Sequence, residues 1–155
     1  MATATTERTL EIEPLQESLR VRIVNRIIKE EDVSQDVACR ILDQTLSFLT
    51  LCANEEGAFT PSPMVDIGWH ALILYTREYA AYCQLIAGRS IHHVPDDAAC
   101  GSQSDTPKQG PAMTMEAMRR FGLPVDEMLW TCLYKDCSNC NGGQGCQCGT
   151  CNYQS

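Results

Sequence analysis

The sequence predicts an all-α protein, a small bundle of four to six helices followed by an irregular, cysteine-rich C-terminal loop. Two kinds of observation support this fold class. Apolar residues recur every three to four positions over residues 12–30 and 35–53, which is the period of an amphipathic helix. In addition, residues that favour helix ends, such as Ser34, Ser62 and Gly88, stand where such patterns begin or stop.

The first two expected helices carry much of the apolar surface. One face of the helix over residues 12–30 is defined by apolar residues spaced four apart: Leu15, Leu19, Ile23 and Ile27. Ser34 is a suitable N-cap for the helix over residues 35–53. Apolar residues cover a wide arc of this second helix, so we expect it to sit at the centre of the bundle.

Two further helices are expected in the middle of the chain. Ser62 followed by Pro63 is a good N-cap and first-turn pair for a third helix. A break near residues 75–77, where Thr76 reads as a fresh cap, separates it from a fourth helix that ends before Gly88. The tyrosines of these helices are expected to be packing residues.

The chain after the fourth helix is expected to be less regular. The segment RSIHHVP is too short and too close to Pro95 to form a helix, so it predicts an extended return. Residues 96–111 are polar and predict a loop. Thr114 is then expected to cap a short helix that ends near Gly122, with one or two more helical turns after it.

Length, composition and charge limit the domain organisation and the partners. The 155 residues, of which 44% are hydrophobic, predict one helical domain over residues 12–131, between a flexible N-terminus (1–11) and a tail (132–155). The formal net charge of −8 disfavours nucleic acid as a partner. No apolar run reaches the roughly 18 residues that a membrane span requires, and no secretory signal is present. We therefore expect a cytoplasmic protein with no membrane partner.

Five cysteines lie within fifteen residues of the tail: Cys137, Cys140, Cys146, Cys148 and Cys151. Two pairs among them have the two-residue spacing that lets both thiolates converge on one ion, so a tetrahedral zinc site is expected. The alternatives are iron or copper, a second metal, disulfide bonds or an unliganded tail. Cys146 stands outside the two pairs and remains an extra ligand or a free thiol. An ordered tail would also offer a docking surface to a protein partner.

A second group of potential ligands lies in the helical domain. Asp66 and His70 are four residues apart on one predicted helix, so their side chains share a face. His92 and His93 follow on the extended return, where adjacent side chains point to opposite faces, so only one of them is expected to join the other two. Two imidazoles and one carboxylate are the donor set of a catalytic zinc centre or of a facial non-haem iron site.

Two questions about this group stay open at the level of sequence. Cys83, on the next predicted helix, would complete a closed tetrahedron and favour zinc, whereas without it one coordination position remains open. Alternatively, the Asp66–His70 pair is a hydrogen-bonded staple that fixes a histidine tautomer and fastens a loop to the helix without any metal.

Residues 65–95, VDIGWHALILYTREYAAYCQLIAGRSIHHVP, resemble the glycine-rich domain-containing protein-like family. Its members share a Val-Asp-x-x-Trp-His helix, a Tyr and a Cys on the next helix and a His before Pro, and small bacterial members also end in a Cys-x2-Cys tail. The matching positions here are Asp66, Trp69, His70, Tyr79, Cys83 and His93. The resemblance implies that His93, rather than His92, faces the helix and shares a functional or metal site with Asp66 and His70. It implies no settled biochemical activity.

The expected function is metal binding, with zinc as the first choice and no assigned reaction. In one alternative the protein is a metal-dependent enzyme, in which the open position at Asp66, His70 and His93 activates a water molecule and Glu78 serves as the general base. In another it is a ribosomal peptide precursor, in which the cysteine- and glycine-rich tail is modified behind a folded leader.

Overall fold

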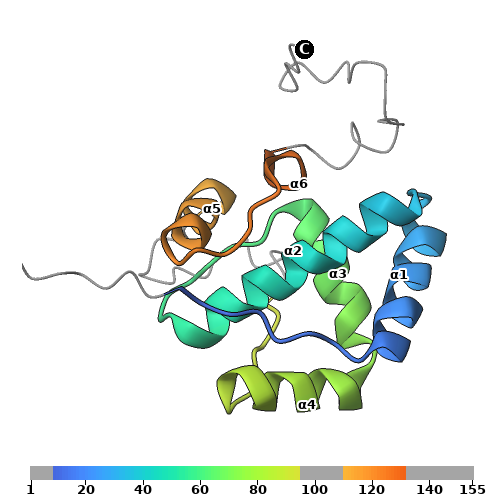
Figure 1. Cartoon of the computed structure of the whole chain (residues 1–155), viewed down its shortest axis with the longest axis horizontal. Helices are drawn as coiled ribbons and strands as arrows, with labels where there is room; N and C mark the ends of the chain where they lie inside the picture. The colour runs from blue at the N-terminus through green and yellow to red at the C-terminus, as the bar shows by residue number, and fades with distance from the viewer. Residues whose placement is uncertain (1–8, 95–109, 132–155) are drawn as a thin grey trace, which may run out of the picture.

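The structure is a computed structural model, and it describes residues 9–94 and 110–131 (Figure 1). Within these residues it contains six α-helices and no strand, which confirms the all-α prediction. The helices are α1 (Glu17–Glu31), α2 (Gln35–Asn54), α3 (Pro63–Ile73), α4 (Thr76–Ala87), α5 (Pro111–Arg120) and α6 (Glu127–Thr131). The five tail cysteines and most of the loop predicted over residues 96–111 lie outside the described residues.

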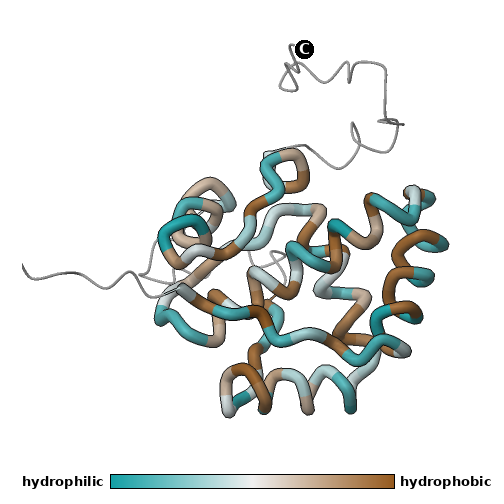
Figure 2. The backbone as a smooth tube through the Cα atoms, in the orientation of Figure 1, coloured by the Kyte–Doolittle hydropathy of each residue, from teal (hydrophilic) through white to brown (hydrophobic). Residues whose placement is uncertain are grey.

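The central element of the bundle is α2, as its wide apolar arc predicts. It contacts α1, α3, α4 and α5 and runs through the middle of the molecule (Figure 1). Its start is capped by Ser34, whose Oγ accepts a hydrogen bond from the Val37 N–H (3.3 Å). Ile41, Leu42 and Phe48 are fully buried. Figure 2 shows hydrophobic residues recurring along α1 and α2 with polar residues between them, the pattern of helices that bury one side.

The first helix begins later than predicted. It starts at Glu17 rather than at residue 12. Pro14 helps to keep residues 12 and 13 out of the helix, because a proline disfavours a helical backbone at the residue before it. The chain ahead of α1 still contributes to the core, since Leu10 is buried and its N–H donates to the Phe121 carbonyl (3.0 Å). The folded domain therefore includes residues before position 12, the predicted boundary.

Two of the predicted caps are wrong, although the helices they mark are present. Thr76 is the first residue of α4, and the N-cap position belongs to Tyr75, which makes no capping hydrogen bond. Thr114 lies inside α5, which begins at Pro111, because proline is well suited to a first helical turn. The Thr114 hydroxyl is buried and accepts a hydrogen bond from the Thr60 N–H (3.0 Å).

A close approach between α2 and α3 fixes the helix that carries Asp66 and His70. Gly68 lies at the crossing, where an added methyl group would collide with Thr45 Oγ1 and come within 3.0 Å of Ile41 Cγ2. With no side chain in the way, Thr45 Oγ1 hydrogen-bonds the Val65 carbonyl across the helix pair (3.1 Å). α3 is thus seated directly on the central helix.

The short helix α6 confirms the one or two turns predicted after the fifth helix, and side-chain hydrogen bonds fasten it to the bundle. Trp130 Nε1 donates to Gln44 Oε1 (2.8 Å), and Ser62 Oγ donates to the Leu129 carbonyl (2.7 Å). Because Gln44 belongs to α2 and Ser62 is the N-cap of α3, the two bonds hold α6 against the central helix and against the start of α3. None of the helices in the described ranges is both long enough and apolar enough to cross a membrane.

Candidate metal centre

The first two residues of the centre are arranged by α3. Ser62 Oγ caps the helix by accepting from the Val65 N–H (3.2 Å), and Pro63 occupies its first turn. Asp66 follows in the first turn, where the helix dipole favours a carboxylate. His70 lies one turn further along, and its Nδ1 is 3.2 Å from Asp66 Oδ2. The four-residue spacing therefore brings the pair together as predicted.

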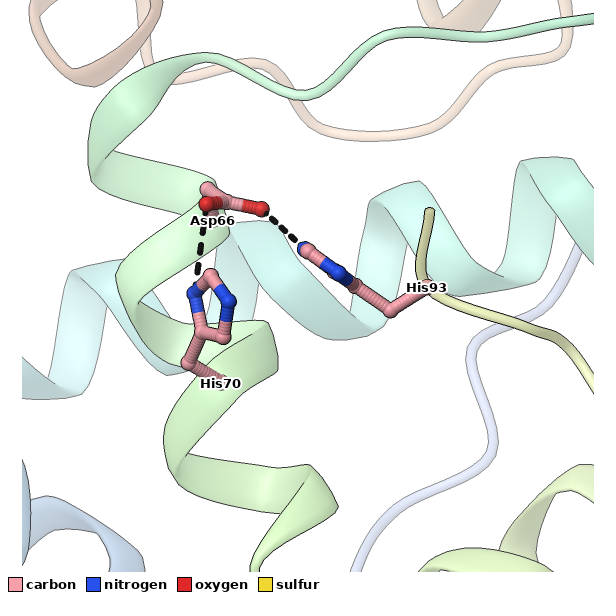
Figure 3. Close-up of side chains that lie close together, drawn as sticks. All are labelled: Asp66, His70 and His93. Atoms are coloured by element: carbon pink, nitrogen blue, oxygen red, sulfur yellow. Dashed lines mark hydrogen bonds and ion pairs between the residues drawn. The ribbon is translucent and has the colours of Figure 1, made fainter. Parts of the chain in front are cut away.

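His93 completes the group. It lies on residues 89–94, the segment that returns toward α3 after α4 and is called the return below. Its Nε2 lies 2.6 Å from Asp66 Oδ1, so each carboxylate oxygen faces a different imidazole (Figure 3). The neighbouring His92 is exposed. This confirms that adjacent histidines diverge on the return and that His93 is the one that faces Asp66.

The centre is buried on one side and open on the other. The His93 side chain is only 11% exposed, that of Asp66 is 33% exposed and that of His70 is 58% exposed. The His93 ring makes a T-shaped contact with Trp69 at a centroid distance of 4.6 Å, and the centroids of the His70 and His93 rings are 4.3 Å apart. Trp69 packs in turn on Phe48 of the core (5.2 Å). His93 thus forms the inner wall of the site and His70 its outer edge.

A tyrosine hydroxyl holds the return that carries His93. Tyr79 Oη donates to the Ile91 carbonyl (2.5 Å) and accepts from Trp69 Nε1 (2.9 Å). Burial raises the pKa of Tyr79 well above its ordinary value of 10.0, so the hydroxyl stays protonated and able to donate in alkaline solution as well as at physiological pH. Gly88 turns the chain out of α4 in the left-handed conformation (φ 64°), as predicted. The tyrosine that the sequence marked as a packing residue therefore also has a polar role.

The donor atoms of the three side chains lie close enough together to serve as ligands of one metal ion. One donor atom from each of Asp66, His70 and His93 can be chosen so that all three lie within 4.8 Å of one another. Zinc bonds of about 2.0–2.1 Å place tetrahedral ligands about 3.4 Å apart, so a modest contraction of the group would enclose an ion. The tautomer of each imidazole decides which of its two nitrogens carries the lone pair that would bind the ion.

A groove of about 910 Å³ borders the centre. Its lining contains all three residues of the group together with apolar and charged side chains, among them Phe59, Trp69, Arg89 and Glu55. Sequence reasoning missed Phe59 and Arg89, because nothing in their local pattern marks them as neighbours of Asp66. The groove gives solutes access to the exposed side of the group.

Two other predicted participants lie elsewhere. Cys83 is buried (1% exposed) and is not among the residues whose donor atoms converge, so the described residues supply three ligands rather than a closed set of four. Glu78, the expected general base, pairs instead with Arg22 of α1 (3.6 Å) and does not line the groove. Both residues are on α4, whose turns place them away from Asp66.

The remaining cysteines add no ligand to this centre in the described part of the chain. Cys52 lines the groove, but its sulfur is not among the donor atoms that converge at the centre. Burial raises the pKa of its thiol to about 12. Cys137, Cys140, Cys146, Cys148 and Cys151 lie outside the described residues, and the zinc site expected there stays a prediction.

A family model described as UCP032817-like matches residues 7–110. The matched range contains α1 to α4 and all three residues of the centre, and it ends before α5. No curated protein and no solved structure matches the chain. The resemblance to the glycine-rich domain-containing protein-like family is not tested by these comparisons and stays a prediction.

Proposed function

The chain belongs to the UCP032817-like family, and we propose that it binds a divalent metal ion, zinc in the first place, through Asp66, His70 and His93. The observation that carries the proposal is the convergence of three donor groups from two segments of the chain. His93 stands 27 residues after Asp66 and yet places Nε2 within 2.6 Å of its carboxylate. Two imidazoles and one carboxylate match the donor set of known zinc and non-haem iron centres.

The competing role is a hydrogen-bonded staple between α3 and the return. A staple needs only the inner contact between His93 and Asp66, which is largely buried. The outer pair adds little to such a staple, because the His70 side chain is 58% exposed, and even an exposed pair with a charged imidazole would contribute only about 0.2–1 kcal/mol. As a metal ligand, His70 has a clear role, since it supplies a third donor on the side from which an ion would enter.

Three protein ligands leave at least one coordination position free for water or another small ligand. Iron or copper would suit the same nitrogen and oxygen donors and are the alternatives to zinc. The groove beside the centre favours a second candidate function, that of a metal-dependent enzyme that activates a bound water. Glu78 has no part in that candidate, because it pairs with Arg22.

For the cysteine-rich tail we propose a second metal site, independent of the one in the helical domain. In a reducing cytoplasm, the five tail cysteines would hold a second ion and offer a surface to a protein partner. If the chain is instead a peptide precursor, protein from its native host will show mass losses or crosslinks in that region. An intact-mass measurement distinguishes the two, because a metalloprotein gives an unmodified chain and releasable metal.

Zinc titration of the full chain tests the central site. The five tail cysteines are changed to serine, so that they cannot compete, and zinc affinity is measured against a chromogenic chelator. We expect one ion to bind per chain and the binding to be lost in Asp66→Asn, His70→Ala and His93→Ala. His92→Ala is the matched control and should bind normally, because His92 is exposed and lines the same groove but is not among the residues whose donor atoms converge with those of Asp66. A parent protein that takes up no zinc, or ligand variants that bind as the parent does, would leave the staple as the role of this group.

A further inference from the structure

We infer that Tyr79 is a positioning residue for this centre, which holds the backbone of the return so that the His93 imidazole faces Asp66 and His70. The inference rests on the proposed metal binding and extends it to a residue that does not touch the ion. The observation behind it is that the Tyr79 hydroxyl links α4, α3 and the return by hydrogen bonds. Tyr79, on α4, bonds the Ile91 carbonyl of the return and the Trp69 indole of α3.

The position of Ile91 explains why this bond governs His93. In an extended segment, residues two apart point to the same side and the residue between them points away. Ile91 is buried, His92 is exposed and His93 faces Asp66, as this alternation requires. A hydrogen bond at the Ile91 carbonyl therefore fixes which histidine is turned inward. A second hydrogen bond, from Arg89 Nη2 to the Cys52 carbonyl (3.0 Å), fastens the return nearer its beginning.

The same hydroxyl also orients the wall on which His93 rests. Trp69 donates its indole N–H to Tyr79 Oη, and its ring makes a T-shaped contact with the His93 ring at a centroid distance of 4.6 Å. Tyr79 thus acts on His93 from two directions, through the backbone at Ile91 and through the ring of Trp69.

The hydrogen bonds of Tyr79 matter more once a metal ion is bound. In the metal-free protein the hydrogen bond to Asp66 helps to orient His93. Once both residues coordinate an ion, their donor atoms point at the ion and no longer at each other. The segment that carries His93 must then be held by other contacts. Without them, the entropy lost when the segment is ordered would weaken metal binding. Groups that orient metal ligands typically change affinity by about 10–100-fold, and an effect transmitted through the backbone belongs at the lower end of that range.

The test compares two tyrosines of the same helix in the full chain in which the five tail cysteines are changed to serine. Tyr79→Phe removes the hydroxyl described above. Tyr82→Phe removes a hydroxyl that donates to the Glu13 carbonyl (2.8 Å), ahead of α1 and away from the centre. Both changes should lower the melting temperature, because each leaves a polar group without its partner. We expect the zinc Kd to rise roughly ten-fold in Tyr79→Phe and less than about two-fold in Tyr82→Phe, measured well below the melting temperature of both.

An unchanged Kd in Tyr79→Phe would overturn the inference, as would an equal weakening in both variants. A second measurement is independent of metal: the imidazole nitrogen signals of His93 in metal-free protein, observed by NMR. These should shift or broaden in Tyr79→Phe and stay as in the parent in Tyr82→Phe. If the parent binds no zinc, the proposed function fails, and the NMR comparison still decides the role of Tyr79. Unaltered His93 signals would then reject it.

Discussion

At the scale of single residues, the Asp66 carboxylate is the hub of the centre because its two oxygens face two different imidazoles. Removing it would leave a largely buried histidine nitrogen without its partner, at a cost of about 1–3 kcal/mol. That cost is the same whether the group binds an ion or only fastens the return to α3. Stability alone therefore does not reveal the role of Asp66, and metal affinity does.

The buried tyrosines predict how stability depends on alkaline pH. Burial raises the pKa of both Tyr79 and Tyr82 above the ordinary value of 10.0. Above that value the unfolded chain loses these protons while the folded chain keeps them, so stability falls as pH rises, and below it these groups contribute no pH dependence. We expect the melting temperature to fall more steeply above about pH 10 in the parent than in Tyr82→Phe. Parallel slopes in the two proteins would contradict this.

Some residue-level features were predictable from the sequence and others were not. Helical spacing placed Asp66 beside His70, and strand alternation required His92 and His93 to diverge. The position of Cys83 was not predictable, because spacing within α4 does not reveal which of its faces turns toward α3. The polar role of Tyr79 was hidden for a related reason: its acceptor is a backbone carbonyl, which leaves no trace in side-chain patterns.

At the scale of elements, α3 acts as the platform of the centre, and Gly68 allows it to lie close to α2. A glycine inside a helical pattern signals such an approach, although the sequence does not name the partner helix. The bounds of α2 were predictable because Ser34 and a long apolar arc agree. The start of α1 was missed because the apolar spacing was extended back past Pro14, although a proline disfavours helix at the residue before it and α1 begins only at Glu17.

Gly68→Ala is expected to destabilise the protein by about 1–3 kcal/mol, since the clash with Thr45 outweighs the roughly 1 kcal/mol that alanine adds to helix propensity. Urea unfolding measures the change. Thr45→Ala removes the colliding oxygen, so in the double variant the loss should be smaller than the sum of the two single losses. Strictly additive losses would show that the two side chains do not meet as described.

At the scale of the whole molecule, the centre joins two parts of the domain that are held in different ways. α3 is fixed by the core and by α6, whereas the return is fixed by hydrogen bonds from Arg89 and Tyr79. All of these parts except α6 lie within the range matched by the family model. An ion at the centre would connect the two parts directly, and so binding should stabilise the fold as a whole.

Zinc should therefore raise the melting temperature of the full chain in which the five tail cysteines are changed to serine. At a free concentration of 100 times its Kd, a ligand that binds only the folded state adds about 2.7 kcal/mol of stability. The shift should disappear on addition of a chelator and be absent in His93→Ala, while His92→Ala should retain it. An equal shift in His93→Ala would place the binding elsewhere in the chain.

The most direct measurement of the central claim is the position of the ion itself. Crystals of the full chain grown with zinc can be measured on both sides of the zinc absorption edge, so that the anomalous difference locates the metal. The account predicts a peak about 2.0–2.2 Å from one oxygen of Asp66 and from one nitrogen each of His70 and His93. Zinc-grown crystals with no peak there, in which Asp66 still hydrogen-bonds both imidazoles, would contradict it.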